Sequence, residues 1–189
     1  EMTSSLVGSE MCIRDRAWRR MYNIAEQLGV TAYNVFVWSP NSVSMPGTEA
    51  NAMKNYYPGD MYVDWLGVSC YPPSLSATYP EERRYPLTLM QGIKQVSADK
   101  PIMISEGGYS STCDHQRWVR EWFKLKDEEP RVKAVVWENH ENAENGDRRL
   151  QSDPLALELY KELVQDPYWL DLIPDAVYSE IETRKNNSK

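Results

Sequence analysis

The segment Lys100-Pro101-Ile102-Met103-Ile104-Ser105-Glu106-Gly107-Gly108 decides the fold. The apolar run 102–104 is unbroken, which is typical of a parallel strand buried on both faces. Glu106 follows this run, and two glycines end the strand where a substrate would need to approach closely. The pattern therefore predicts a carboxylate at the carboxyl end of a buried strand and not in the core.

The same strand-and-helix unit occurs four times along the chain. Strands are expected at 33–38, 62–71, 101–106 and 132–137, so that successive strand ends are 33, 35 and 31 residues apart. Such spacing fits βα units and predicts an α/β fold with a parallel sheet. Because no Gly-x-Gly-x-x-Gly motif is present, a dinucleotide-binding fold is disfavoured. Four units equal half of an eight-stranded (β/α)₈ TIM barrel, so a half barrel is predicted.

Helical periodicity fills the intervals between these strands. Apolar residues recur at helical spacing over 17–28, 86–97 and 114–126, and Asp153-Pro154 opens one further helix with Leu155, Leu159 and Leu163 aligned. The loop 40–58 has room for a short helix. Beyond residue 169 we expect one more surface helix that frays at its end.

The composition excludes several classes of partner. The net charge is −7 and the pI about 5.0 without a Lys/Arg-rich block, so neither nucleic acid nor an anionic membrane is an expected partner. No apolar run approaches the roughly 20 residues that span a bilayer. Seven Trp and twelve Tyr against two Phe favour flat surfaces with polar edges, which suit sugar rings as well as core packing. Cys12, Cys70 and Cys113 form neither a metal motif nor an even disulfide set, so no metal site is expected.

The first sixteen residues stand apart from the rest. Residues 1–16 show no clear periodicity and resemble a translated sequencing-adaptor artefact, so we interpret them as a non-native leader; a flexible tail is the alternative. The expected organisation is this leader, a partial barrel over 17–169 and a C-terminal tail over 170–189.

Several candidate residues keep two interpretations at this point. Glu106 is either a functional carboxylate or a structural partner that closes the sheet. For Trp38, Tyr71 and Trp137, core packing competes with ligand stacking. Other polar residues are expected to be structural: His115 caps a helix or lies on the surface, Asp60 is a turn residue, 147–149 is a charged loop, and Glu138, Glu141 and Glu144 are mainly solvated, although Glu138 or His140 is close enough along the chain to touch substrate.

Four segments together resemble glycoside hydrolase family 26, the β-mannanase family. They are 35–41 (VFVWSPN), 56–71 (YYPGDMYVDWLGVSCY), 100–106 (KPIMISE) and 135–137 (VVW), and they resemble the last four strands of that barrel. The resemblance covers 17–169. The block from residue 56 is quite specific, whereas the segment 100–106 alone is shared by many barrel glycosidases.

The resemblance implies a role for each site residue. It implies Glu106 as the nucleophile, Tyr71 as the hydrogen-bonding partner that orients it, and Trp38 and Trp137 as aromatic walls around the cleaved sugar. Asn41 and His140 are further substrate-binding candidates. A retaining mechanism needs two carboxyl groups about 5–5.5 Å apart. The family's acid/base glutamate follows a histidine at the end of the fourth strand, upstream of Ala17. Glu10 has no such context, so the acid/base residue is expected to be absent from this chain.

The resemblance also sets what the chain is expected to do. It implies a retaining hydrolase of β-1,4-mannan or a related β-glycan, without a cofactor, in a parent protein that is expected to be secreted or periplasmic. The chain itself is expected to be an inactive piece that self-associates through unpaired strand edges. A non-catalytic carbohydrate-binding remnant and a different retaining barrel glycosidase stay open as alternatives. Glu138 departs from the apolar residue expected after Trp137, which leaves that subsite uncertain.

Overall fold

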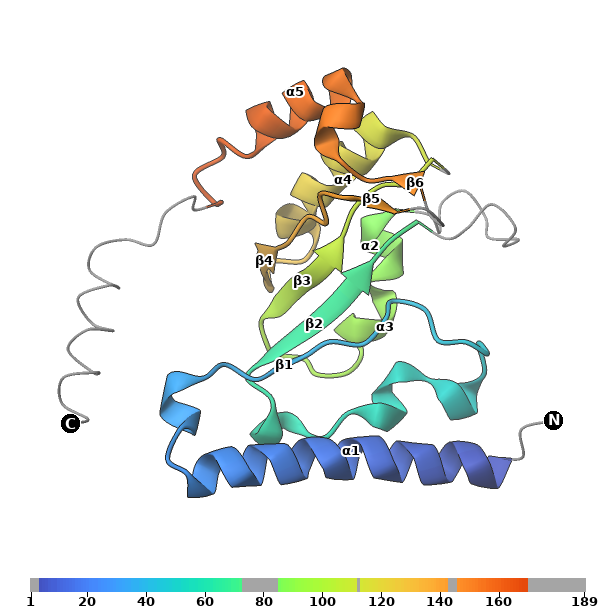
Figure 1. Cartoon of the computed structure of the whole chain (residues 1–189), viewed down its shortest axis with the longest axis vertical. Coiled ribbons are helices and arrows are strands. Elements are labelled where there is room, and N and C mark those ends of the chain that lie inside the picture. Colours follow the sequence, from blue (N-terminus) through green and yellow to red (C-terminus); the bar gives the residue numbers. More distant parts are fainter. Residues whose placement is uncertain (1–3, 73–84, 112, 143–145, 170–189) are drawn as a thin grey trace.

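The computed structural model describes residues 4–72, 85–111, 113–142 and 146–169. Its centre is a four-stranded parallel sheet in the order β1-β2-β3-β4 (Figure 1). The strands are β1 Val37–Trp38, β2 Trp65–Cys70, β3 Ile102–Gly107 and β4 Val132–Val135. This order, in which each strand pairs with the next along the chain, confirms the predicted α/β partial barrel. β1 and β4 are the edges of the described sheet, and self-association through them stays a prediction.

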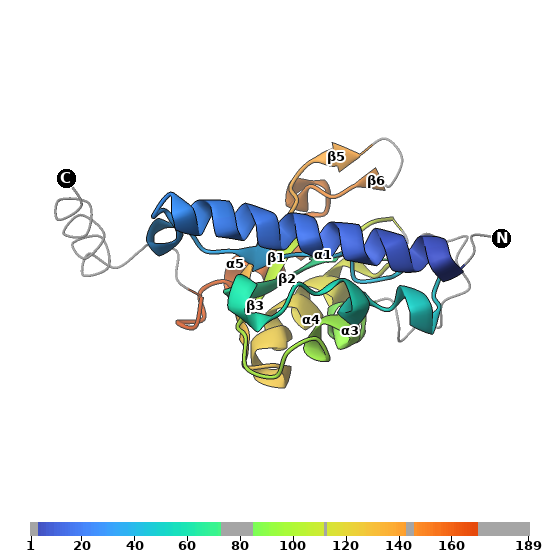
Figure 2. The same ribbon diagram turned by 90° about the horizontal axis from the view of Figure 1, so that it is seen from below.

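Helices accompany the sheet in the described residues. They are α1 Ser4–Gln27, α2 Pro86–Leu89, α3 Gln91–Lys94, α4 His115–Glu128 and α5 Pro154–Leu163, and Figure 2 shows α3 and α4 together on one side. Helix α3 contacts β2 and α4 contacts β4, whereas α5 packs on α4 and α1 on short 3-10 helices within residues 31–62. Trp118 and Trp122 of α4 are fully buried in the core with Ile102 and Ile104 of β3. The helix begins where the Asp114 carboxylate accepts the backbone N–H of Arg117. Burial of this apolar stripe is the main stabilisation of the helix layer.

The strand predicted at 33–38 is wrong in its extent. Only Val37 and Trp38 pair with β2, and residues 31–33 form a 3-10 helix instead. Val35 is 63% exposed, so the run is not buried on both faces. The physical reason is that β1 lies at the edge of the described sheet and pairs with β2 alone. Neither strand pairing nor burial therefore extends along the whole apolar run.

The helix predicted at 86–97 is divided into α2 and α3. Met90 ends the first helix and precedes the second with ψ near −7°, so that the α-helical ladder is interrupted there. Met90 and Ile93 are nevertheless fully buried, as the predicted apolar stripe requires. In α5, Asp153 caps the first turn as expected, but Leu155 is 66% exposed and lies outside the buried stripe.

Helix α1 begins well before the predicted start near residue 17. It runs unbroken from Ser4, so the expectation that organised structure starts at Ala17 is wrong. The helix is held by contacts within itself and with the 3-10 helix Asp60–Tyr62: Asp15 and Arg19 form an i,i+4 ion pair, and Trp18 Nε1 donates to the carbonyl of Tyr62 at 2.8 Å. The origin of residues 1–16 stays an interpretation from the sequence.

Short elements complete the described chain. The 3-10 helices Glu49–Asn51, Met53–Tyr56 and Asp60–Tyr62 lie between β1 and β2, in agreement with the short helix allowed there, and a fourth spans Leu150–Ser152. The hairpin of β5 Glu141–Asn142 and β6 Gly146–Asp147 follows β4. None of the helices in the described ranges has both the length and the apolar character needed to cross a membrane. The helix expected beyond residue 169 lies outside the described residues.

Candidate active site

The ends of β2 and β3 bring Glu106 and Tyr71 together. Ser69 of β2 is the register partner of Glu106, and a register shift between Val68 and Ser69 precedes this pair. Tyr71 follows β2 by one residue. Burial raises the pKa of Tyr71, and the carboxylates of Glu106 and Glu138 raise it further, which places the phenol beside both acids. The Tyr71 hydroxyl is buried and has no hydrogen bond of standard geometry among the described residues.

Glu106 itself is open to solvent. It is the exposed residue of β3, and its Oε2 accepts a long hydrogen bond of 3.4 Å from the Ser69 hydroxyl. Asn41 forms an isolated parallel bridge with Ser69, so the chain after β1 also reaches this edge. A carboxylate in this position is able to contact a ligand above the strand ends, as predicted for the carboxyl ends of barrel strands.

The two glycines after Glu106 differ in their surroundings. A Cβ on Gly107 would lie 2.5 Å from both the Cys70 carbonyl oxygen and the Trp122 ring, whereas one on Gly108 would meet Trp137 at 3.6 Å. Gly107 is thus required by the close approach of α4 and of the β2 backbone. That the pair lets substrate approach closely stays a prediction.

A second acidic residue, Glu138, reaches the same phenol from the chain after β4. Its Oε2 is bound by Arg148, and its Oε1 lies 3.0 Å from His140 Nδ1. The Arg148 guanidinium stacks 4.0 Å from the centre of the Tyr71 ring and is only 6% exposed. The prediction of a mainly solvated Glu138 is therefore wrong, because its side chain is folded inward against Tyr71. The segment 147–149 is a charged loop as predicted, with Arg148 buried and the Arg149 side chain 46% exposed.

The two carboxylates differ in what they can do. Burial alone would raise the pKa of Glu138, but the Tyr71 hydroxyl and the charges of Arg148 and His140 outweigh burial and hold this pKa below its usual value. A carboxylate held ionised is a poor proton donor. Among the described residues Glu106 forms no ion pair, and its Oε2 accepts a hydrogen bond from the neutral Ser69 hydroxyl, so Glu106 is the better candidate for the reacting carboxylate. Glu10 belongs to helix α1 and to no strand, as expected from the sequence.

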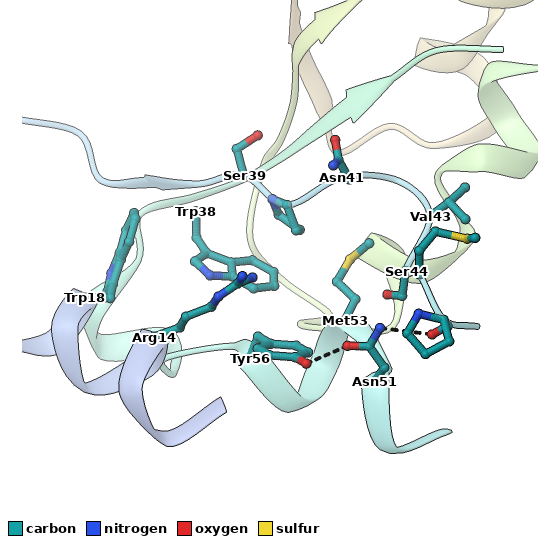
Figure 3. Close-up of a pocket in the computed structure, with 13 residues that line it drawn as sticks. Arg14, Trp18, Trp38, Ser39, Asn41, Val43, Ser44, Asn51, Met53 and Tyr56 are labelled. Carbon is teal, nitrogen blue, oxygen red and sulfur yellow. Dashed lines mark hydrogen bonds between the residues drawn. The ribbon is translucent and has the colours of Figure 1, made fainter. Parts of the chain in front are cut away.

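Trp38 is not brought together with Glu106. Side chains alternate along a strand, and Ser39 points to the open side, where its hydroxyl bonds that of Ser105. Trp38 consequently points to the helix side, where it is 8% exposed and meets Tyr57 edge-on at 5.1 Å. Figure 3 shows this indole in a cavity of about 570 Å³ next to Arg14, with Ser39 and Asn41 turned the other way.

Trp137 also packs inward. Its ring meets the rings of Tyr109, Trp122 and Tyr160 at 5.1, 5.4 and 5.7 Å, and its Nε1 donates to the Arg148 carbonyl at 3.0 Å. These contacts fit core packing better than ligand stacking, the two interpretations that the sequence left open for Trp137. Trp38 ends β1, whereas Trp137 lies two residues after β4, and both indoles contact other core aromatics. Their role as aromatic walls of a sugar site stays a prediction.

The remaining candidates have structural partners. His115 opens α4, stacks on Tyr109 at 4.0 Å and pairs with the Asp153 carboxylate at 3.0 Å, in agreement with a capping position. Asp60 accepts the Tyr57 hydroxyl at 2.7 Å within its turn. Across the ranges that the structure describes, no three His, Cys, Asp or Glu residues gather as metal ligands would.

The sequence analysis missed Arg148 as a residue of this site. It lies forty-two positions after Glu106 in a loop without periodicity, so no spacing rule points to it. One signal was available: Glu138 follows an apolar strand directly, as an ionisable residue also follows strand 102–104. A carboxylate in such a place needs a cation when it is buried.

Comparison with known proteins gives one family and a set of similar folds. The sequence model described as "Glycosyl hydrolase family 26" matches residues 8–123. The catalytic domain of the Bacillus sp. JAMB-750 "GH26 Endo-beta-1,4-mannanase" is similar at a TM-score of 0.55 and 19% identity, with 88% of this chain and 45% of that chain covered. A "GH26 beta-mannanase" from Bacteroides ovatus is similar at a TM-score of 0.53 and 18% identity, with 82% and 44% covered. At these identities the likeness concerns the fold.

The comparisons also bound the extent of the match. This chain spans less than half the length of both structures. No curated protein matches it.

Proposed function

Because the chain belongs to glycosyl hydrolase family 26, we propose that its parent protein is a retaining glycoside hydrolase of β-1,4-mannan or a related β-glycan. The observation that carries the proposal is the exposed carboxylate of Glu106 at the end of β3, beside Tyr71. The substrate class rests on the family and on the word mannanase in the names of the two similar structures.

In this proposal Glu106 is the nucleophile. Its carboxylate attacks the anomeric carbon, the bond to the leaving oxygen breaks, and a covalent glycosyl ester forms that water later hydrolyses. Tyr71 orients the carboxylate from the neighbouring strand. Its raised pKa keeps the phenol protonated, and therefore a donor, at neutral pH. Asn41 and His140 are proposed to contact the sugar from the loops after β1 and β4.

The acid/base carboxyl is proposed to lie outside this chain. It has to protonate the leaving oxygen and would stand about 5–5.5 Å from the nucleophile. Glu138 does not fit, because Arg148 and His140 occupy its two oxygens and its pKa is lowered. Without acid assistance the chain alone loses about 10² to 10⁴-fold in rate on natural glycans.

An activated glycoside tests the nucleophile without needing the acid. A 2,4-dinitrophenyl 2-deoxy-2-fluoro-β-mannoside carries a leaving group that departs as an anion without protonation. We expect Glu106 to form an ester with its anomeric carbon as dinitrophenolate leaves. Mass spectrometry of digested protein should find the fluoromannosyl mass on the peptide that contains Glu106.

Two variants test whether the label forms specifically on Glu106. Glu106→Gln should abolish it, whereas Glu121→Gln, which changes an acid on α4 that pairs with Arg117, should leave it in place. A label that persists in Glu106→Gln, or no label at millimolar reagent, would contradict the proposal. Binding of mannan without any label would instead favour a carbohydrate-binding protein.

A further inference from the structure

Arg148 is anchored in a way that a surface loop residue does not require. Its backbone N–H donates to the His140 carbonyl at 3.1 Å, and its own carbonyl accepts the Trp137 indole N–H at 3.0 Å. The side chain is 8% exposed, and its guanidinium lies over the face of Tyr71 at 4.0 Å. A buried cation on an aromatic face is attracted by the ring and restrains its orientation.

The phenol of Tyr71 faces two carboxylates that compete for its one proton. Glu106 and Glu138 both lie near enough to act on the hydroxyl. Arg148 binds Oε2 of Glu138, and His140 lies 3.0 Å from Oε1. Both oxygens of Glu138 thus have cationic or N–H partners, whereas Oε2 of Glu106 accepts a long hydrogen bond of 3.4 Å from Ser69. The Glu106 carboxylate can therefore accept a further hydrogen bond from the Tyr71 hydroxyl.

We infer that Arg148 is a positioning residue, which together with Glu138 directs the Tyr71 hydroxyl to Glu106. The guanidinium acts in two ways: it stacks on the ring, and it binds one oxygen of Glu138, which leaves fewer acceptor sites there for the Tyr71 hydroxyl. Nothing in the family match assigns this role, since the matched residues end at 123. The inference rests on the proposed function only in naming Glu106 as the group that benefits.

A double-mutant cycle read by NMR tests this coupling without turnover. The ¹³Cζ signal of Tyr71, in protein labelled with [4-¹³C]tyrosine and assigned with Tyr71→Phe, reports the acceptor of its hydroxyl. Glu106→Gln should displace this signal in the otherwise unchanged chain. In the Arg148→Met background the displacement should fall by more than half, because the phenol then has Glu138 as an alternative acceptor.

Arg149→Met is the matched control. Arg149 is the next residue, with a side chain 46% exposed and paired to Asp147 and Glu141, so it removes the same charge without touching Tyr71. In this background Glu106→Gln should displace the signal by its full amount. Equal displacement in the Arg148→Met and Arg149→Met backgrounds would overturn the inference. If Arg148→Met does not fold, Arg148→Lys decides instead: it keeps the charge beside Glu138 but loses the planar stack, so an intermediate displacement is expected and a full one would overturn the inference.

The labelling reaction separates this inference from the proposed function. Ester formation at Glu106 should slow by about 10- to 100-fold in Arg148→Met, as expected for a misplaced reacting group. It should recover in part in Arg148→Lys and be unchanged in Arg149→Met. If the unchanged chain takes no label, the proposed function fails while the NMR cycle still decides the role of Arg148.

Discussion

The two faces of the four-stranded sheet differ in what they contribute. On the helix side, Ile102 and Ile104 of β3 are fully buried. On the other side, the same strand presents Ser105, bonded to Ser39, and a register shift at this point of the sheet is followed by the exposed Glu106 at the strand end. Because side chains alternate along a strand, each strand supplies packing to one face and polar groups to the other. The stability of this chain therefore depends on one face, and its candidate chemistry on the other.

The largest difference between the faces should appear in β3. Ile104→Ala removes a fully buried side chain and should lower the free energy of unfolding by about 2–5 kcal/mol. Met103→Ala, one residue earlier and half-buried, should cost about 1 kcal/mol. Urea unfolding followed by circular dichroism measures both. Similar costs at the two positions would show that the open face is buried in solution.

Substitutions at Gly107 and Gly108 test the same difference between the two faces, because each adds a single methyl group. Gly107→Ala adds a methyl that would lie 2.5 Å from Trp122 and should cost about 1–3 kcal/mol, the usual range for an overpacked core. Gly108→Ala meets its nearest neighbours at 3.6 Å and should be neutral or stabilising by about 0.4–1 kcal/mol. Thermal unfolding of the two variants gives the order, and the reverse order would break the assignment of Gly107 to the helix side.

Acid should weaken both faces through different carboxylates. Hydrogen bonds from Arg131 lower the pKa of Glu129, which is buried next to the helix layer, and the pKa of Glu138 on the open side is also lowered. These groups stabilise the fold above the ordinary carboxyl pKa of about 4, and this stability is lost as pH falls through their lowered values.

Urea midpoints at pH 7, 5 and 3 measure the acid effect. We expect little change between pH 7 and 5 and a fall between pH 5 and 3. Glu129→Gln and Glu138→Gln should each make the fall shallower. An Asp127→Asn variant, which changes an exposed acid paired with Lys126, should not. A fall of unchanged depth in both Gln variants would assign the acid sensitivity to other groups.

Much of the fold was predictable because it follows from local patterns. The four parallel strands, the buried stripe of α4 and the helix start at Asp153 all follow from patterns within a few residues of sequence. The limits of β1 and the break at Met90 were not predictable, since pairing partners and packing set them. The continuous helix α1 was missed because its first turns show little periodicity.

The sequence by itself determined which residue types are available at the strand ends, and so identified Glu106 and Tyr71 as neighbours on adjacent strands. Only the tertiary structure decided which way each side chain points and which distant charge meets it. It turned Trp38 and Trp137 toward the helices, and it folded Arg148 over Tyr71. The physical reason is that the position of a strand follows from a run of apolar residues in the local sequence. A buried ion pair depends on where a loop without a periodic sequence pattern returns to the sheet.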